Sequence, residues 1–167
     1  MKHQRKWINA ITLITTALGL LSGTITQAAE QGKTTGVAAF HAQGAVTEYE
    51  PGVGVWLGKF VGVSKTDSGS GPLHNAGWDC TGESVFQEGT LYQADGFCIV
   101  TDQGGNTINL IWEQTHVPAA LGSAKTKGTY LSGTGKYAGI NGYYTFSCQL
   151  SGAMSICDIT SGEYALP

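Results

Sequence analysis

The sequence contains almost no arginine, since Arg5 is the only one among 167 residues. From residue 29 onward, six basic residues stand against twelve acidic ones, which gives a formal charge of −6. Arginine provides the bidentate fork that holds phosphate groups, and a positive balance attracts the nucleic acid backbone. We therefore expect no nucleic acid partner.

The N-terminal apolar segment is too short to span a membrane as a helix. It runs from Ile8 to Leu21, or 14 residues, whereas a spanning helix needs about 20. Basic residues precede it and small residues follow it, which is the pattern of a secretory signal peptide. The sequence predicts a signal peptide over residues 1–28, cleaved after Ala28 or alternatively after Ala29. An uncleaved anchor is the other interpretation.

Removal of this signal would leave residues 29–167, enough chain for a single domain. We expect the domain to be exported, either to the periplasm or outside the cell. No stable membrane insertion is expected after cleavage.

Beyond the signal, the sequence shows no convincing helical periodicity. Short segments rich in β-branched and aromatic residues recur between glycine-rich turns, a pattern typical of an all-β meander. Because closure removes exposed sheet edges, the predicted fold is an all-β, eight-stranded antiparallel up-and-down barrel. The expected strands are 38–49, 54–64, 75–86, 91–101, 106–115, 123–131, 142–150 and 154–165.

The four cysteines lack the paired C-x-x-C spacings of zinc sites. An even number of cysteines in an exported chain favours disulfides. A two-residue turn at Gly152 and Ala153, and a three-residue loop from Glu88 to Thr90, would each bring two cysteines face to face on adjacent strands. The predicted bridges are Cys80–Cys98 and Cys148–Cys157.

Residues 132–142 read SGTGKYAGING, in which Gly133, Gly135 and Ala138 have the G-x-G-x-x-A spacing of dinucleotide-binding turns. Such a turn requires a following helix, whose N-terminus holds the pyrophosphate. The residues that follow are strand formers, so we interpret the stretch as a barrel corner with Lys136 solvated. No cofactor is expected.

The same stretch resembles the G-G-T-G-x-[FY]-x-x-x-x-G motif of the allene oxide cyclase-like and dirigent-like β-barrel superfamily. Ser132 replaces the first glycine of the motif, and Asn141 stands where an arginine is frequent. The resemblance implies an antiparallel eight-stranded barrel with an apolar lumen, often oligomeric, so a homo-oligomer is one expectation. The matching positions are Gly133, Thr134, Gly135, Tyr137 and Gly142.

Six aromatic residues can either line a ligand cavity or fill the core, because an eight-stranded barrel is just wide enough for both outcomes. The function expected first is binding of a small apolar ligand in the barrel or at its mouth. The alternatives are a cyclase or isomerase of the same fold and a non-catalytic structural or protein-binding module. The candidate lining residues are Trp56, Phe60, Trp78, Trp112, Tyr144 and Phe146.

No catalytic constellation is legible, and the chain is not expected to be an enzyme. Glu113 is the one catalytic candidate, as a buried carboxylate if its strand face points inward and as a solvated side chain otherwise. In an up-and-down meander His41, His74 and Asp102 could meet at one barrel end as a metal site. The alternative is that the histidines are separate surface residues, and no metal is expected.

Overall fold

A computed structural model describes residues 29–167, so the predicted signal peptide and its cleavage site lie outside the described residues. Within this part of the chain, no helix has the length and apolar character needed to cross a membrane. Among residues 29–167, the only helical element is a short 3-10 turn, η1. The elements are β1 (Glu30–Lys33), β2 (Gly36–Glu50), β3 (Val53–Thr66), β4 (Ala76–Gln87), β5 (Thr90–Thr101), β6 (Thr107–Gln114), β7 (Ala119–Ala120), β8 (Ser123–Gly133), η1 (Gly135–Tyr137), β9 (Asn141–Ser151) and β10 (Met154–Leu166).

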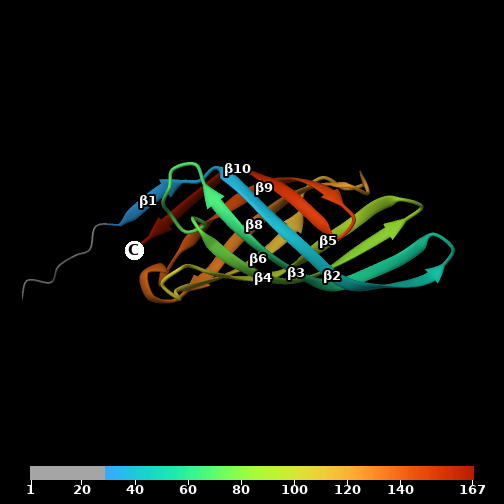
Figure 1. Cartoon of the computed structure of the whole chain (residues 1–167), viewed down its shortest axis with the longest axis horizontal. Helices are drawn as coiled ribbons and strands as arrows, with labels where there is room; N and C mark the ends of the chain where they lie inside the picture. Colours follow the sequence, from blue (N-terminus) through green and yellow to red (C-terminus); the bar gives the residue numbers. More distant parts are fainter. Residues whose placement is uncertain (1–28) are drawn as a thin grey trace, which may run out of the picture.

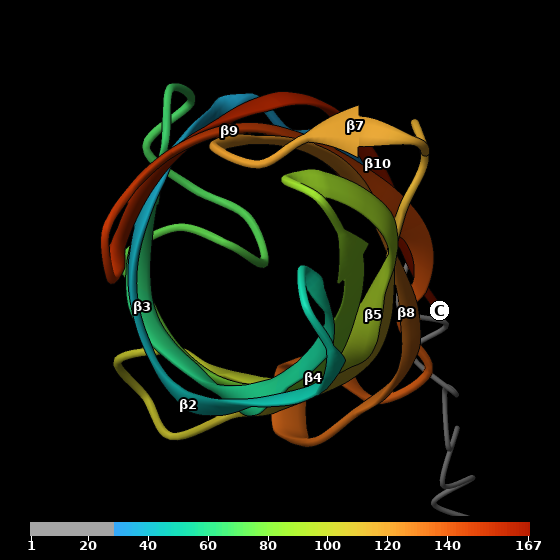
Figure 2. The same cartoon turned by 90° about the vertical axis from the view of Figure 1, so that its right-hand side faces the viewer.

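Eight of these strands close into an antiparallel barrel in which sequence neighbours are spatial neighbours (Figures 1 and 2). Closure occurs at β10, which pairs with β9 along one edge and with β2 along the other. The predicted fold class is therefore confirmed. Two short strands were not expected: β1 extends the sheet beside β10, and β7 pairs with the start of β5.

The lumen is filled from alternating positions of each strand. In β6, for example, Ile108 and Leu110 point inward and are fully buried. The next residue, Ile111, points to the outer wall and is 48% exposed. Aromatic rings from several strands meet edge to face inside, such as Trp78 with Tyr144 at a centroid distance of 5.5 Å. The buried apolar side chains form one continuous core inside the barrel.

Glycines in the wall make room for the large rings of the lumen. A Cβ atom on Gly128 would overlap the ring of Tyr144, and one on Gly82 would overlap the ring of Trp112. Gly62 gives the same space to Phe40. The alternation of large and small residues thus produces a curved wall in which each ring lies against bare backbone.

Both predicted disulfides are present, Cys80–Cys98 between β4 and β5 and Cys148–Cys157 between β9 and β10. The four cysteines are buried and face the lumen. The turn at 152–153 has the predicted length, because Ser151 pairs with Met154.

The β4–β5 connection is shorter than predicted. Gln87 pairs with Thr90, so only Glu88 and Gly89 form the turn, and both have positive φ. A β-bulge lies next to this turn, between Val85 and Phe86. It shifts the pairing of β4 with β5 by one residue, to the predicted register. The predicted three-residue loop was wrong. The predicted cysteine pairing is nevertheless correct, because a two-residue turn followed by a bulge gives the same register as a three-residue loop.

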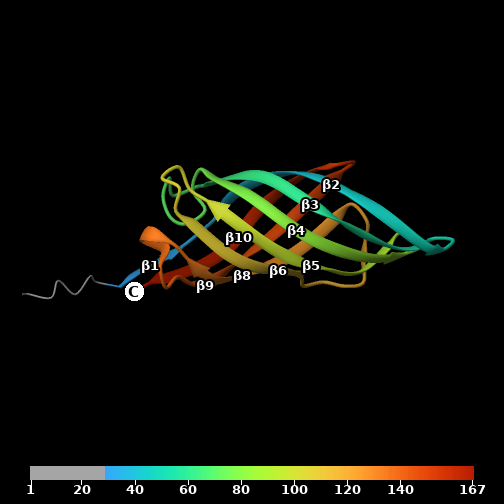
Figure 3. The ribbon, with the colours of Figure 1, turned by 90° about the horizontal axis from the view of Figure 1, so that it is seen from below.

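The connection between β3 and β4 folds into one end of the barrel and blocks it with buried side chains; Figure 2 shows this loop reaching over the far opening from one side. Pro72 and Leu73 from this loop are fully buried. Ser64 holds the loop, since its hydroxyl donates to the carbonyl of Leu73 over 2.6 Å and accepts from Trp78 Nε1 over 2.8 Å. The connections 102–106 and 134–140 gather at this same end (Figure 3), and the shorter hairpin turns lie at the other.

Candidate functional site

The lumen holds a cavity of about 120 Å³ between the blocked end and the hairpin end. Its wall is mostly apolar and includes both disulfides. The hairpin end is the mouth, where Leu150 lines the cavity and is 43% exposed. For comparison, an engineered apolar cavity of about 150 Å³ stays dry and binds benzene. The volume therefore suits a molecule of single-ring size.

Five of the six predicted aromatic residues line this cavity, and Trp56 does not. Trp56 lies beside the cavity, with its ring centroid 4.9 Å from that of Phe60. Phe40 also lines the cavity and was missed, although it follows buried Ala38 with period two. The five lining residues are Phe60, Trp78, Trp112, Tyr144 and Phe146.

The polar groups of the cavity come from a small set of uncharged side chains. Ser84, Thr126 and Ser155 contribute hydroxyls, and Gln114 contributes a primary amide. None of the described residues that line the cavity is an Asp, Glu, Lys, Arg or His. Because an unpaired charge is costly to bury, such a wall favours an uncharged occupant.

Gln114 is 8% exposed and is the most buried of these polar side chains at the mouth. Its Nε2 donates to the carbonyl of His116 over 3.1 Å. Its Oε1 is buried without a hydrogen-bond partner, the one such side-chain atom found among residues 29–167. Sequence reasoning missed Gln114, although it continues the inward alternation of Leu110 and Trp112.

The phenol groups inside the barrel stay protonated at neutral pH. Burial raises the pKa of Tyr144 well above its usual value, and it raises the pKa of Tyr130 in the same direction. Both side chains are therefore neutral neighbours of the cavity.

Glu113 lies on the outer wall, because Trp112 takes the inward position of β6. It is exposed and pairs across the strands with Asp95 and Lys127. The structure places this carboxylate outside the lumen.

The metal-site candidates are not brought together. His41 sits in mid-strand on the outer wall, paired with Val61 and Met154. His74 Nδ1 is 2.9 Å from the hydroxyl of Thr66. No group of three or more possible metal-ligating side chains occurs within the described part of the chain.

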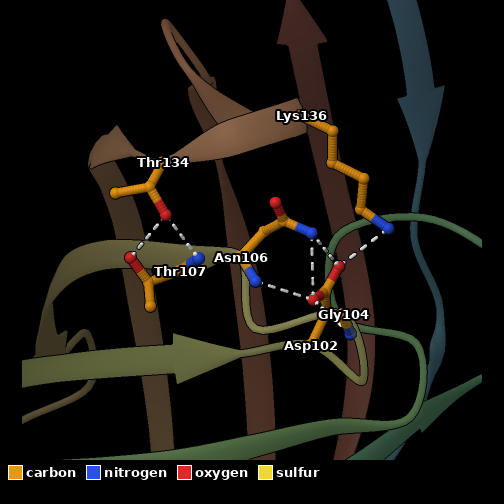
Figure 4. A network of polar contacts seen from close by, with 6 residues as sticks. All are labelled: Asp102, Gly104, Asn106, Thr107, Thr134 and Lys136. Atoms are coloured by element: carbon orange, nitrogen blue, oxygen red, sulfur yellow. Dashed lines mark hydrogen bonds and ion pairs between the residues drawn. The ribbon is translucent and has the colours of Figure 1, made fainter.

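Asp102 instead anchors the barrel corner, as Figure 4 shows. Its carboxylate accepts from Lys136 Nζ over 2.7 Å, from the backbone N–H of Gly104 over 2.8 Å and from that of Asn106 over 2.9 Å. The ion pair with Lys136, together with these hydrogen bonds, holds the pKa of Asp102 well below its usual range. Lys136 was expected to be free in solvent; its side chain is 62% exposed, but its ammonium group is paired.

The glycine motif serves this corner. Gly135 has a φ of +55°, and a Cβ atom there would overlap Asn106 Oδ1. Thr134 Oγ1 accepts from the backbone N–H of Thr107 over 2.9 Å, which ties the corner to β6. Tyr137 is buried in the core, and Gly142, with a φ of +122°, lets β9 approach the backbone of Glu163. The stretch contains the 3-10 turn η1 and leads directly into strand β9, so the geometry is that of a corner.

Comparisons with protein-family models, with curated proteins and with solved structures found no match to this chain. The architecture and the cavity therefore carry the functional argument.

Proposed function

We propose that the barrel binds a small, uncharged, largely apolar molecule in its lumen. The observation that carries the proposal is the cavity of about 120 Å³, with its aromatic wall and its approach from the hairpin end. Pockets of this kind gain affinity by burying apolar ligand surface, at about 25 cal/mol for each Å².

The proposal includes a kinship and a location. The SGTGKYAGING stretch and the eight-stranded architecture support a relationship to the allene oxide cyclase-like and dirigent-like barrels. The two disulfides support an exported protein, because such bonds persist in oxidising compartments. N-terminal sequencing of protein secreted by a bacterial host tests the location, with Ala29 or Glu30 expected as the first residue.

A titration of the folded protein with toluene, followed by the NMR signals of the backbone amides, tests the binding site. Residues around the lumen, such as Trp78 and Phe146, should shift, whereas exposed positions on the outer wall should not. Shifts confined to the outer wall, or no saturable shift, would contradict lumen binding.

A matched pair of variants on β5 sharpens the test. Ala94 lines the cavity and is 7% exposed, so Ala94→Leu places extra carbon atoms inside it. Gln93→Leu introduces the same side chain at the neighbouring exposed position. Toluene binding should be lost in the first variant and kept in the second, with thermal unfolding used to verify that both are folded.

A further inference from the structure

The outer wall of the barrel has two unlike sides. On β10, β2, β3 and β5, several outward positions carry large apolar side chains that are 41–65% exposed. The outward positions of β8 and β9 are mainly polar, such as Lys127 and Thr145. In the closed barrel β8 lies opposite β3, because three strands separate them in either direction. We call the exposed group on the first side the apolar patch, and its large members are Val37, Val61, Val63, Ile99, Met154 and Ile156.

The strand register makes the apolar patch continuous. Two rows of outward residues cross the strands next to each other. The first row, from β10 to β4, contains Ile156, Ala39, Val63 and Gly77. The second row, from β10 to β5, contains Met154, His41, Val61, Asp79 and Ile99. Val37 extends the patch beyond Ala39 on β2.

The apolar patch is large enough to form the centre of a stable interface. Five strands about 4.8 Å apart and three outward positions about 6.7 Å apart give a footprint of about 24 by 20 Å. A contiguous apolar patch of roughly 500 Å² is at the upper end of what monomers expose and commonly marks a functional surface. Stable interfaces bury about 800 Å² on each partner, with an apolar core and a polar rim. Exposed Lys59 and Lys65, at the two ends of the patch along β3, provide part of such a rim.

Two ionisable side chains indicate what covers the apolar patch. Within its two rows, which belong to the described part of the chain, the ionisable residues are His41 on β2 and Asp79 on β4. They flank Val61, one strand to each side. An apolar partner would leave the carboxylate of Asp79 covered without a counter-group, which is unfavourable. A fitting partner therefore presents a donor opposite Asp79 and an acceptor opposite His41.

A second copy of the same patch meets this requirement. A two-fold axis that lies in an interface exchanges the two sides of the line along which it runs, so residue i meets residue j and j meets i. With the axis along β3, His41 faces the partner's Asp79, and Asp79 faces the partner's His41. Val61 and Val63, on the axis, each face the same residue of the partner.

We propose that two copies of the barrel associate through the outer faces of β2, β3 and β4, with a two-fold axis along β3 and two reciprocal contacts between His41 and Asp79. Ala39 faces the partner's Gly77 in this arrangement, and because both residues are small, the two sheets can approach closely. The association uses the side of the barrel and leaves its mouth free. It is therefore independent of what the lumen holds.

Sedimentation velocity of the exported protein at micromolar concentrations tests the dimer. The wild type should sediment as a dimer. Val63→Asp puts a carboxylate at the centre of the apolar patch and should sediment as a monomer. Thr129→Asp, at an outward position of β8 on the opposite side of the barrel, is the matched control and should remain dimeric. Circular dichroism verifies that both variants are folded.

A charge exchange tests the two-fold arrangement. His41→Asp sets two carboxylates against each other at both contacts and should weaken association at least about tenfold, because facing like charges are strongly unfavourable. Adding Asp79→His to this variant restores opposite groups with their places exchanged. The double variant should therefore associate about as tightly as the wild type.

A wild type that stays monomeric at these concentrations, or that forms trimers, would overturn the proposal. So would a dimeric Val63→Asp, or a double variant that associates no more tightly than His41→Asp. Flotation of monomeric wild type with phosphatidylcholine vesicles would assign the apolar patch to a lipid surface and overturn the dimer. If Val63→Asp does not fold, the charge exchange decides.

Discussion

Lys136 Nζ lies 2.7 Å from Asp102 Oδ2, so the β5–β6 turn and the β8–β9 corner are joined by an ion pair at the blocked end of the barrel. The two side chains differ in exposure, 62% for Lys136 and 5% for Asp102. The nearly buried carboxylate depends on this contact more than the exposed ammonium group does. Stability should therefore respond to both partners, but in different ways.

Replacing the lysine should weaken the corner without unfolding the protein. Lys136→Ala removes the counter-charge and leaves Asp102 with its N–H donors from Gly104 and Asn106. Because the lysine is largely solvated, we expect the free energy of unfolding to fall by about 1 kcal/mol. Urea denaturation measures the effect, and Lys125→Ala, at an exposed position of β8, serves as the control. Equal stability of the two variants would contradict the assigned role.

Because of Asp102, the free energy of unfolding should depend on pH in the acidic range. Its pKa is lowered in the folded state, chiefly by the ion pair with Lys136. The carboxylate therefore adds stability above its unfolded pKa of about 4, and this contribution is lost as the pH falls toward the folded pKa. The stability advantage of the wild type over Asp102→Asn should be full at about pH 6 and shrink below about pH 4. Parallel pH profiles would refute this, and Asp158→Asn, on an exposed strand position, is the control.

Gly135 should tolerate no side chain. Its φ of +55° disfavours other residues, and a Cβ atom would also overlap Asn106, which binds Asp102. Gly105 has a φ of +79° with no atom near the position of its missing Cβ. Gly105→Ala therefore measures the conformational cost alone, about 1 kcal/mol. Gly135→Ala should cost clearly more in chemical denaturation, and similar losses would show that the corner adapts.

Gly128 provides a test of the ring packing in the lumen. A Cβ atom there would overlap the ring of Tyr144, which is 1% exposed and cannot move outward. We expect Gly128→Ala to destabilise the barrel by about 1–3 kcal/mol, the usual cost of overpacking. Gly77 is also a strand glycine, but its nearest atom is 3.9 Å from the added Cβ. Gly77→Ala should be neutral or slightly stabilising.

The two disulfides should contribute according to the loops they close. The sequence separations are 18 for Cys80–Cys98 and 9 for Cys148–Cys157. The chain-entropy description gives about 3 kcal/mol for each bridge, with about 0.6 kcal/mol more for the longer loop. Unfolding of the two double-alanine variants measures both values. A smaller loss at Cys80 and Cys98 than at Cys148 and Cys157 would contradict this ranking.

Much of the barrel could be predicted because period-two alternation and turn residues act locally. The turn at Gly152 and Ala153 fixed the pairing of β9 with β10, and with it the bridge between Cys148 and Cys157. The bulge after Val85 could not be predicted, since a tight turn with a bulge and a longer loop give the same register beyond them.

The features that shape the cavity depend on contacts distant in sequence. Pro72 and Leu73 follow a glycine- and serine-rich segment that indicates an ordinary surface turn, yet both are fully buried and Leu73 belongs to the core. The direction of Glu113 was undecided because both faces of β6 carry apolar residues, such as Leu110 inside and Ile111 outside. The volume left between the rings follows from glycines such as Gly128 and Gly82, whose effect appears only once the strands are paired.

Because the β3–β4 loop blocks one end, the barrel is a cup rather than a tube. The proposed ligand would therefore enter and leave by the same route, and a second molecule could not displace it from the blocked end. Side chains that narrow the rim without touching the occupant therefore slow arrival and departure by the same factor. Such residues would set the exchange rate of the proposed ligand, whereas contacts with the cavity wall would set its equilibrium affinity.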